Sequence, residues 1–217
     1  MATPKSQTYA EKKRGRFITF EGGDATGKTT QIEALSAFLT SRNITHITTR
    51  EPGGTPFAEA LRTILLGDCG RDAHPLTHAI LMSAARFEHV QNVIKPALLK
   101  GSWVICDRFF DSTTVYQGNA MGVDQEIIQQ LHTMVLSGLT PDLTLVFHLK
   151  ADTALQRGRL RAQNHYDQKD AAFKARVDAG FKKLLQQNPD RCVLIDAAQS
   201  VPNLAKTIQQ ILHKRFF

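Results

Sequence analysis

Short runs of apolar residues alternate along the chain with longer stretches in which apolar residues recur every three to four positions. Runs such as Leu143 to Phe147 are almost continuously apolar, as expected of parallel strands buried on both faces. Strands are predicted at Arg16–Glu21, Ile44–Thr49, Trp103–Asp107, Leu143–Leu149 and Cys192–Asp196. Helices are predicted at Lys28–Ser41, Pro56–Leu66, Pro75–Leu99, Asp124–Ser137, Thr153–Gln163, Ala171–Gln187 and Asn203–Lys214. This alternation is typical of an α/β fold, with a five-stranded parallel sheet flanked by helices and a ligand at the carboxyl ends of the strands.

The composition is that of an ordinary globular chain. Its 217 residues suffice for one domain with a sizeable core, and 42% hydrophobic and 22% charged residues are usual proportions. No apolar run approaches the roughly 18 residues of a membrane-spanning helix, and the start of the chain lacks the apolar segment of a secretory signal. We expect a disordered basic tail over residues 1–15, a single domain over residues 16–217, and no membrane partner.

The net charge of +7 is concentrated near the start of the chain. Residues 1–16 carry five positive side chains against one carboxylate, Glu11, which leaves only +3 for the remainder. Binding of nucleic acid calls for a basic face on the folded domain. The charge therefore gives weak support for such a function, and we expect no nucleic-acid partner.

The cysteines and one pair of histidines are the remaining candidates for metal or redox chemistry. Cys69, Cys106 and Cys192 lack metal or disulfide spacing, which suits a reducing cytoplasm, and the latter two are expected in the core. His74 and His78 lie four residues apart, but no zinc-protease pattern accompanies them. We expect them on a helix surface or at a helix cap.

The strongest chemical signal is a glycine-rich loop. Residues Gly22 to Thr29 match G-x-x-x-x-G-K-[ST] between a predicted strand and a predicted helix, the context of a phosphate-binding P-loop. The alternative is a glycine-rich turn with a chance lysine. Gly22 and Gly27 let backbone N–H groups face an anion, Lys28 would reach the β and γ phosphates, and Thr29 would bind Mg²⁺. The predicted nucleotide-binding residues of the loop are Gly22, Gly23, Asp24, Ala25, Thr26, Gly27, Lys28, Thr29 and Thr30.

Further motifs follow the other strands and narrow the range of P-loop proteins. The chain contains no Asn-Lys-x-Asp sequence of the kind with which GTPases read their base. It does contain Arg50-Glu51-Pro52-Gly53-Gly54-Thr55, then Asp107-Arg108-Phe109, then Tyr116-Gln117-Gly118. In this order the motifs resemble those of the thymidylate kinases (dTMP kinases), from about residue 16 to the C-terminus.

The resemblance implies a P-loop NTPase fold of the nucleoside-monophosphate-kinase type with an arginine-rich lid. It implies transfer of the γ-phosphoryl group of ATP to dTMP, with Mg²⁺ as cofactor, giving dTDP and ADP for dTTP synthesis. It also implies a homodimer, with the helix at Pro75–Leu99 and its neighbours at the interface.

Phosphoryl transfer requires positioning and charge neutralisation, so cations should line a site that joins two anionic substrates. The resemblance places Arg108 on the acceptor phosphate, Asp24 near the acceptor 3′-hydroxyl, and Asp107 with Thr29 on the Mg²⁺ side. A surface arginine paired with Asp107 is the alternative for Arg108. The predicted catalytic residues are Lys28, Arg108, Arg157, Arg161 and Asp24.

The resemblance also assigns the acceptor pocket. Arg50, oriented by Glu51, is a second acceptor-side arginine, Arg86 bonds a thymine carbonyl and Thr113 reads N3. Tyr116 lies against the deoxyribose. Arg86 could instead be a helix-surface residue, and Arg62 either adds positive charge or is solvated. The predicted dTMP-binding residues are Asp24, Arg50, Pro52, Met82, Arg86, Arg108, Ser112, Thr113, Tyr116 and Gln117.

One pocket position departs from the family. Met82 lies four residues before Arg86, where many members place a phenylalanine that stacks on thymine. A methionine can lie on an aromatic ring but holds it more loosely. The alternative is a core methionine, with Phe109 supplying aromatic surface.

The predicted lid, about residues 155–170, carries Arg157, Arg159 and Arg161. Gly23 to Thr26 contain no basic residue, so the resemblance is to the bacterial form whose lid arginines supply the transition-state charge and bind ATP. Their spacing cannot place all three on one helix face, and a solvated basic helix is the alternative. His165 stands where the family usually has an arginine.

Two rival functions are kept. One is a P-loop kinase that prefers dUMP or a broader range of pyrimidines. The other is a regulatory or nucleic-acid-binding P-loop protein that hydrolyses its nucleotide slowly, for which the basic tail is the only support. The dTMP kinase hypothesis predicts negligible ADP release until dTMP is added.

Overall fold

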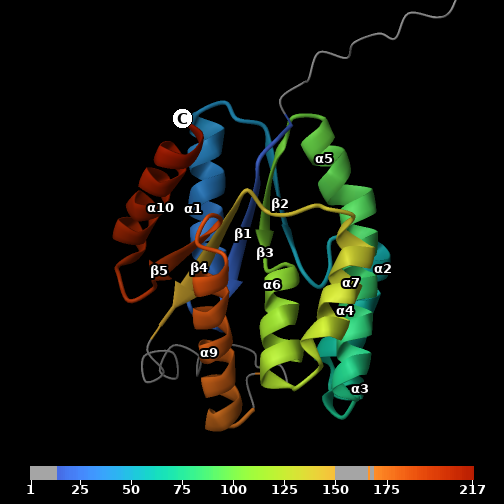
Figure 1. The fold of residues 1–217 in the computed structure, drawn as a ribbon. Helices are drawn as coiled ribbons and strands as arrows, with labels where there is room; N and C mark the ends of the chain where they lie inside the picture. The colour runs from blue at the N-terminus through green and yellow to red at the C-terminus, as the bar shows by residue number, and fades with distance from the viewer. Residues whose placement is uncertain (1–13, 150–165, 167–168) are drawn as a thin grey trace, which may run out of the picture.

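The computed structural model describes residues 14–149, 166 and 169–217. Within these residues, five parallel strands form one sheet in the order β2-β3-β1-β4-β5, flanked by helices (Figure 1). The strands are β1 (Phe17–Gly22), β2 (His46–Arg50), β3 (Trp103–Asp107), β4 (Leu143–His148) and β5 (Cys192–Asp196). The helices are α1 (Lys28–Ser41), α2 (Pro56–Leu66), α3 (Asp68–Arg71), α4 (Pro75–His89), α5 (Lys95–Leu99), α6 (Phe110–Thr113), α7 (Gln125–Leu136), α9 (Ala171–Gln187) and α10 (Val201–Phe216), with π-helical segments η1 (Val90–Ile94) and η2 (Thr114–Ala120).

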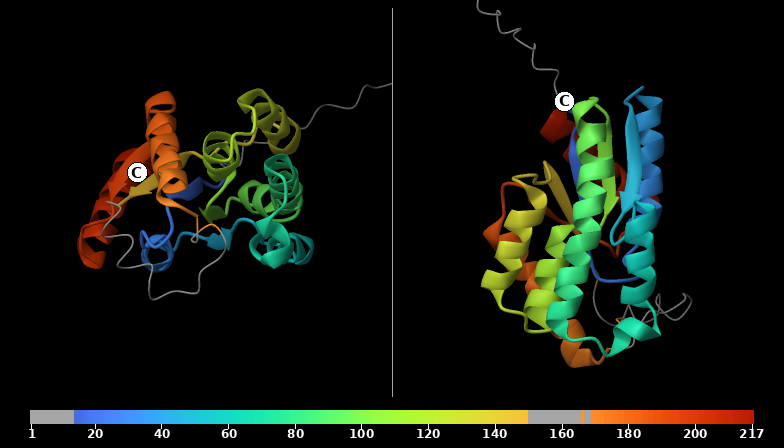
Figure 2. Two further views of the ribbon diagram at one scale, coloured as in Figure 1. Left: turned by 90° about the horizontal axis from the view of Figure 1, so that it is seen from below. Right: turned by 90° about the vertical axis from the view of Figure 1, so that its right-hand side faces the viewer.

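Both faces of the sheet are buried at its centre, because apolar side chains leave β1, β3 and β4 in both directions. Ile18 and Phe20 of β1 pack into a cluster that contains residues of α1 and α10. Phe17 packs into a second cluster with residues of η1, α5 and α7. The sheet therefore lies between two helical layers (Figure 2), as the near-continuous apolar runs predicted.

The predicted strands agree with the observed ones to within two residues at each end. Six of the seven predicted helices are present, and the seventh, Thr153–Gln163, lies outside the described residues. The predicted helix Pro75–Leu99 is α4, η1 and α5 in succession. Pro96 lacks the N–H that an uninterrupted α-helix would use, and the wider turns of η1 directly precede it.

The sequence pattern predicts neither α3 nor the segment formed by α6 and η2. The latter, Phe110–Ala120, combines three consecutive threonine or valine residues with Gly118, a sequence of low helix propensity. Val115 and Ala120 are buried against Phe173 and Val177 of α9. Tertiary packing thus stabilises the helical turns that carry Ser112 to Gln117.

None of the described helices is long and apolar enough to cross a membrane.

Candidate active site

The loop between β1 and α1 has the conformation that its glycines allow. Gly22 has φ 124°, and a Cβ there would collide with the Phe147 carbonyl of β4. Gly27 has φ 88° and forms the N-cap of α1. The Lys28 side chain is buried against this loop, and its Nζ donates to the Gly23 carbonyl at 2.6 Å. Burial, followed by the charge of Arg108, lowers the pKa of Lys28 to about 8.

Arg108 joins the P-loop to the end of β3. It has a left-handed backbone, φ 66°, directly after the strand. Its Nη1 donates to the Gly22 carbonyl at 2.8 Å and to Ser112 Oγ at 3.1 Å, and its Nη2 pairs with Asp24 at 2.8 Å. The ion-pair partner of Arg108 is Asp24 and not Asp107, so the alternative of a surface arginine paired with Asp107 is excluded.

Glu21 supports this corner from within β1. Its Oε1 accepts the Phe109 N–H at 2.7 Å, and its Oε2 lies 2.5 Å from the Ser112 hydroxyl oxygen. Burial, followed by the nearby charge of Asp111, raises the pKa of Glu21 to about 8. The sequence motifs do not single out Glu21, although a carboxylate at the end of an apolar strand is a signal for it.

Two oxygen donors fit the predicted Mg²⁺ site. Asp107 Oδ1 is buried and has no hydrogen-bond partner among the described residues, while Thr29 lies exposed in the first turn of α1. The described residues contain no cluster of three or more acidic, histidine or cysteine side chains that could hold a metal alone. One carboxylate and one hydroxyl suit Mg²⁺ that is bound chiefly through substrate phosphates.

A pocket opens beside Arg108, at the carboxyl end of the sheet. It is lined by Asp24, Glu51, Pro52, Arg62, Leu66, Met82, Arg86, Arg108, Phe109, Ser112, Thr113, Tyr116, Gln117 and Tyr166. Every predicted dTMP-binding residue except Arg50 is in this set. Phe109, proposed as extra aromatic surface, and Arg62, whose Nη1 donates to the Pro52 carbonyl at 2.8 Å, are also in it.

Arg50 and Glu51 have different partners from those expected. Arg50 is half exposed and pairs with Glu59 of α2 at 3.0 Å. Glu51 is buried and pairs with Arg86 Nε at 2.7 Å and His89 Nδ1 at 3.0 Å. The expectation that Glu51 orients Arg50 is therefore wrong. Successive side chains of extended backbone point to opposite sides, so neighbours at a strand end do not share a partner.

Arg86 is a buried residue, not a helix-surface arginine. Its Nη2 donates to Thr113 Oγ1 at 3.1 Å, and its guanidinium carbon lies 5.5 Å from the centre of the Phe109 ring. Its Nη1 is buried and finds no hydrogen-bond partner among the residues that the structure describes. This N–H group is the donor that Arg86 can offer to a ligand in the pocket.

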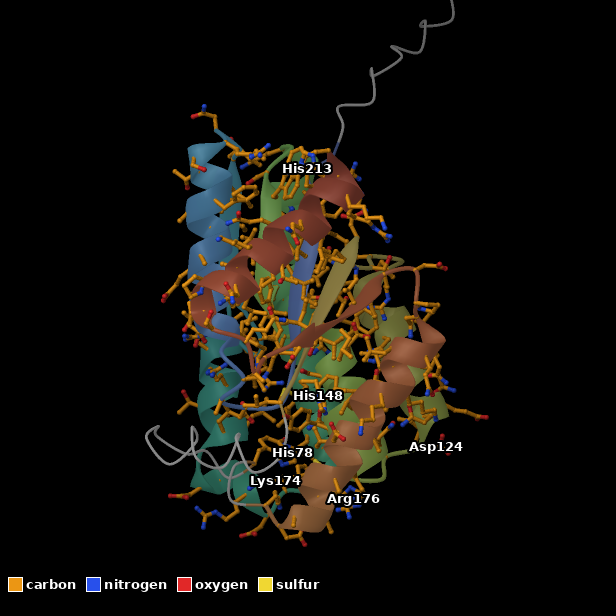
Figure 3. All side chains as sticks on the ribbon, turned by 90° about the vertical axis from the view of Figure 1, so that its left-hand side faces the viewer. His78, Asp124, His148, Lys174, Arg176 and His213 are labelled. Atoms are coloured by element: carbon orange, nitrogen blue, oxygen red, sulfur yellow. The ribbon has the colours of Figure 1, made fainter. Side chains whose placement is uncertain are left out.

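A second set of buried polar side chains forms the pocket wall near Tyr116. Gln117 Nε2 donates to the Tyr166 hydroxyl at 3.0 Å, which lies 3.0 Å from His78 Nδ1. His78 Nε2 in turn lies 2.8 Å from the Gly70 carbonyl. Figure 3 shows His78 toward the same end of the molecule as His148, the last residue of β4. The expectation that His78 lies at a helix surface or cap is wrong.

The other expectations from sequence have mixed outcomes. His74 caps α4 by accepting the Leu76 N–H at 3.2 Å, and Cys106 and Cys192 are buried, as predicted. The predicted lid arginines Arg157, Arg159 and Arg161, together with His165, lie outside the described residues.

Comparison with known proteins identifies similar chains. The family model described as "Thymidylate kinase" matches residues 20–208. The chain is 41% identical to the thymidylate kinase of Magnetococcus marinus, over 94% of this chain and 98% of that protein. It is 39% identical to that of Nitrobacter winogradskyi, over 99% and 93%. A crystal structure of thymidylate kinase from Ehrlichia chaffeensis superposes with a TM-score of 0.74 at 33% identity, over 92% of this chain and 99% of the other.

Proposed function

The chain belongs to the thymidylate kinase family and transfers the γ-phosphoryl group of ATP to dTMP, giving dTDP and ADP in dTTP synthesis, and we propose the residues by which it does so. The observation that carries the assignment is the contact of Arg108 with both the P-loop carbonyl of Gly22 and the acceptor pocket. A guanidinium in this place can hold an acceptor phosphate against the phosphates of a nucleotide in the P-loop. Positioning of this kind is the main requirement of phosphoryl transfer.

Lys28 and Arg108 neutralise the two phosphate groups that meet. Each cation has an acceptor within the protein, the Gly23 carbonyl for Lys28 and the Asp24 carboxylate for Arg108. Phosphate oxygens would take over these donors, and Asp24 would then be available to the acceptor 3′-hydroxyl. The two cations thus move from protein acceptors to substrate oxygens without a change of fold.

Arg86 and Thr113 read the base. Arg86 Nη1 donates to the thymine carbonyl on C4, while Thr113 Oγ1 receives Arg86 Nη2 and keeps a second lone pair for the base N3–H. Met82 lies against the thymine ring, and Tyr116 borders the deoxyribose. The guanidinium carbon of Arg108 lies 5.3 Å from the centre of the Tyr116 ring. Pro52, Ser112 and Gln117 complete the pocket wall.

Thr29 and Asp107 are the residues that would hold Mg²⁺, which when bound neutralises charge on the transferred phosphoryl group. The buried Oδ1 of Asp107, which has no hydrogen-bond partner in the part of the chain that the structure describes, supports this role. By family resemblance, Arg157 and Arg161 of a lid at about residues 155–170 complete the ATP site. We place this machinery in one kinase domain, residues 16–217, at work in the cytoplasm.

A homodimer is the proposed assembly. Three neighbouring helices, α2, α4 and α7, each expose two apolar residues spaced seven apart, which places each pair on one helix face (Figure 1). These residues, between 38% and 72% exposed, are Phe57, Ile64, Ile80, Phe87, Ile127 and Met134. Light scattering should show that I80D/F87D is a monomer and that V201D, at the exposed first residue of α10, remains a dimer. Two monomeric or two dimeric variants would contradict this interface.

The function is tested by ADP production from Mg·ATP alone and with dTMP, dUMP, UMP, dCMP or AMP. We expect turnover to be strongest with dTMP and negligible without acceptor. Arg108→Ala should lower kcat/KM for dTMP at least about a hundredfold, since it removes charge-assisted bonds worth roughly 1.5–3 kcal/mol each. Arg14→Ala, which breaks an exposed ion pair with Asp142 at the amino end of the sheet, is the control and should stay within about twofold of the wild type. ADP release that ignores the acceptor would refute the proposal.

A further inference from the structure

A buried hydrogen-bonded chain runs from β2 to the arginine that faces the base. The Thr49 hydroxyl lies 2.7 Å from His89 Nε2, and His89 Nδ1 lies 3.0 Å from Glu51 Oε1. The other oxygen of Glu51 receives Arg86 Nε at 2.7 Å. Glu51 and Arg86 line the acceptor pocket, whereas Thr49 and His89 are not among its lining residues.

The carboxylate of Glu51 fixes the position of one hydrogen in this chain. An ionised carboxylate only accepts, so His89 Nδ1 carries the hydrogen directed at Glu51. His89 Nε2 can then accept the Thr49 hydroxyl hydrogen. The backbone of Gly54 (φ 87°) also confines the imidazole, since it lies so close to the ring that a Cβ added to Gly54 would collide with it. His89, fully buried, therefore has little freedom to turn.

The consequence falls on Arg86. Glu51 holds Nε and Thr113 holds Nη2, so the plane of the guanidinium and the direction of Nη1 are both determined. If Glu51 loses the bond from His89, its carboxylate can rotate, and Arg86 rotates with it. The side chain of His89 thus acts on the pocket through the side chains of Glu51 and Arg86.

We infer that His89, held by Thr49, is a positioning residue for base recognition, which fixes Glu51 and through it the Nη1 donor of Arg86. The inference rests on the proposed function of Arg86 at the thymine carbonyl. It predicts an effect confined to the acceptor base, with no change in the handling of ATP.

The probe for that effect is 5-methyl-dCMP, which differs from dTMP in the C4 substituent and the protonation of N3. The amino group on C4 of 5-methyl-dCMP is a hydrogen-bond donor and cannot accept from Arg86 as the carbonyl of dTMP can. A well-placed Arg86 should therefore discriminate strongly against 5-methyl-dCMP. The ratio of kcat/KM for dTMP to that for 5-methyl-dCMP measures this placement. An inactive fraction of enzyme lowers both values equally and leaves the ratio unchanged.

Two substitutions separate the two nitrogens of His89. Asparagine places its amide where Nδ1 was, so H89N keeps a donor to Glu51, whereas glutamine reaches only the position of Nε2. We expect H89Q to lower the ratio about tenfold, through a raised KM for dTMP and with KM for ATP within about twofold, and H89N to stay within about threefold of the wild type. T49V, which preserves shape but removes the hydroxyl, should lower the ratio less than H89Q and provides a second test if H89Q folds poorly.

R86Q, measured in parallel, distinguishes failure of this inference from failure of the function on which it rests. If R86Q changes the ratio but H89Q and T49V do not, Arg86 reads the base and His89 does not position it. Equal losses on both substrates in H89Q and H89N would likewise reduce His89 to a packing role. If R86Q itself leaves the ratio unchanged, the assignment of Arg86 fails and the inference fails with it.

Discussion

Replacement of Glu21 by glutamine tests the electrostatics beneath Arg108. The Glu21 carboxyl is fully buried in β1, between the Phe109 N–H and the Ser112 hydroxyl. Burial, then the charge of Asp111, raises its pKa from 4.5 to about 8. A carboxyl with this pKa carries its proton at pH 7. Glutamine can accept the Phe109 N–H with its carbonyl oxygen and donate its amide N–H to the Ser112 oxygen, as the protonated carboxyl can, and is therefore a close mimic of the native side chain.

The size of the effect follows from proton linkage. Between pH 4.5 and about 8 the folded chain holds a proton on Glu21 that the unfolded chain has released. The contribution of Glu21 to stability is thus fully present below pH 4.5 and is lost as the pH rises to about 8, at about 1.4 kcal/mol per pH unit. At pH 7 the loss is roughly 3 kcal/mol. Since the glutamine side chain introduced by E21Q does not titrate, the variant should match the wild type near pH 4.5 and exceed its stability by about 3 kcal/mol at pH 7.

Urea unfolding at pH 5, 6, 7 and 8 measures this difference directly. E59Q is the matched control. Burial acts to raise the pKa of Glu59, but bonds from the Gly54 N–H and Arg50 lower it more, so its contribution is present above pH 4.5 and is lost on acidification. E59Q should therefore show a small difference of opposite sign. An E21Q variant that is no more stable than the wild type at pH 7, with a difference that stays constant from pH 5 to 8, would show that Glu21 is ionised over this range and would refute the raised pKa.

Three further variants or profiles test other parts of the site. Because the pKa of Lys28 is lowered to about 8, kcat/KM for ATP should fall above pH 8 as the ammonium loses its proton. The value of kcat at saturating ATP should stay constant to higher pH. A kcat/KM that does not change up to pH 9.5 would contradict this. Met82→Phe should lower KM for dTMP about two- to tenfold by aromatic stacking, and initial rates that show no change would place Met82 away from the base. Asp111→Asn removes the buried carboxylate of a bidentate pair and leaves the Arg191 guanidinium, 16% exposed, without its counter-charge. This variant should be destabilised by about 3 kcal/mol in thermal melts, with partial recovery in D111N/R191M, and equal stability of all three proteins would contradict this role.

The sheet could be predicted from sequence because β1, β3, β4 and β5 are compact, mainly apolar runs with polar residues at their ends. The helices at Lys28–Ser41, Pro56–Leu66 and Ala171–Gln187 have the observed bounds, since their apolar spacing and flanking residues agree with the packing. The segment Phe110–Ala120 could not be predicted, because its helical turns depend on contacts with α9 that lie more than fifty residues away in sequence.

The candidate site likewise contains features that the sequence predicts and features that it does not. Motifs at strand ends identified most of the residues that line the pocket, because parallel strands bring their carboxyl ends to one edge. The partners of those residues could not be predicted. Whether Glu51 contacts Arg50 or Arg86 depends on the direction of one side chain at a strand end, and His89 lies 38 positions away from Glu51. Local sequence motifs therefore reveal which residues belong to the site, whereas tertiary contacts determine how their side chains are oriented.

Arg86 and Arg108 pair with different acids in this pocket, Glu51 and Asp24, and the difference agrees with the role proposed for each arginine. An unpaired buried guanidinium is strongly unfavourable, so a site built for anions must also supply anions of its own while it is empty. Arg86 has Glu51, whose side chain is 3% exposed and is tied to His89, so this pair persists when a base binds. Arg108 has Asp24, whose side chain is 40% exposed on the P-loop, where a substrate phosphate can displace it. Burial of the acid thus separates an arginine held for reading the base from one that exchanges partners with the phosphate it binds.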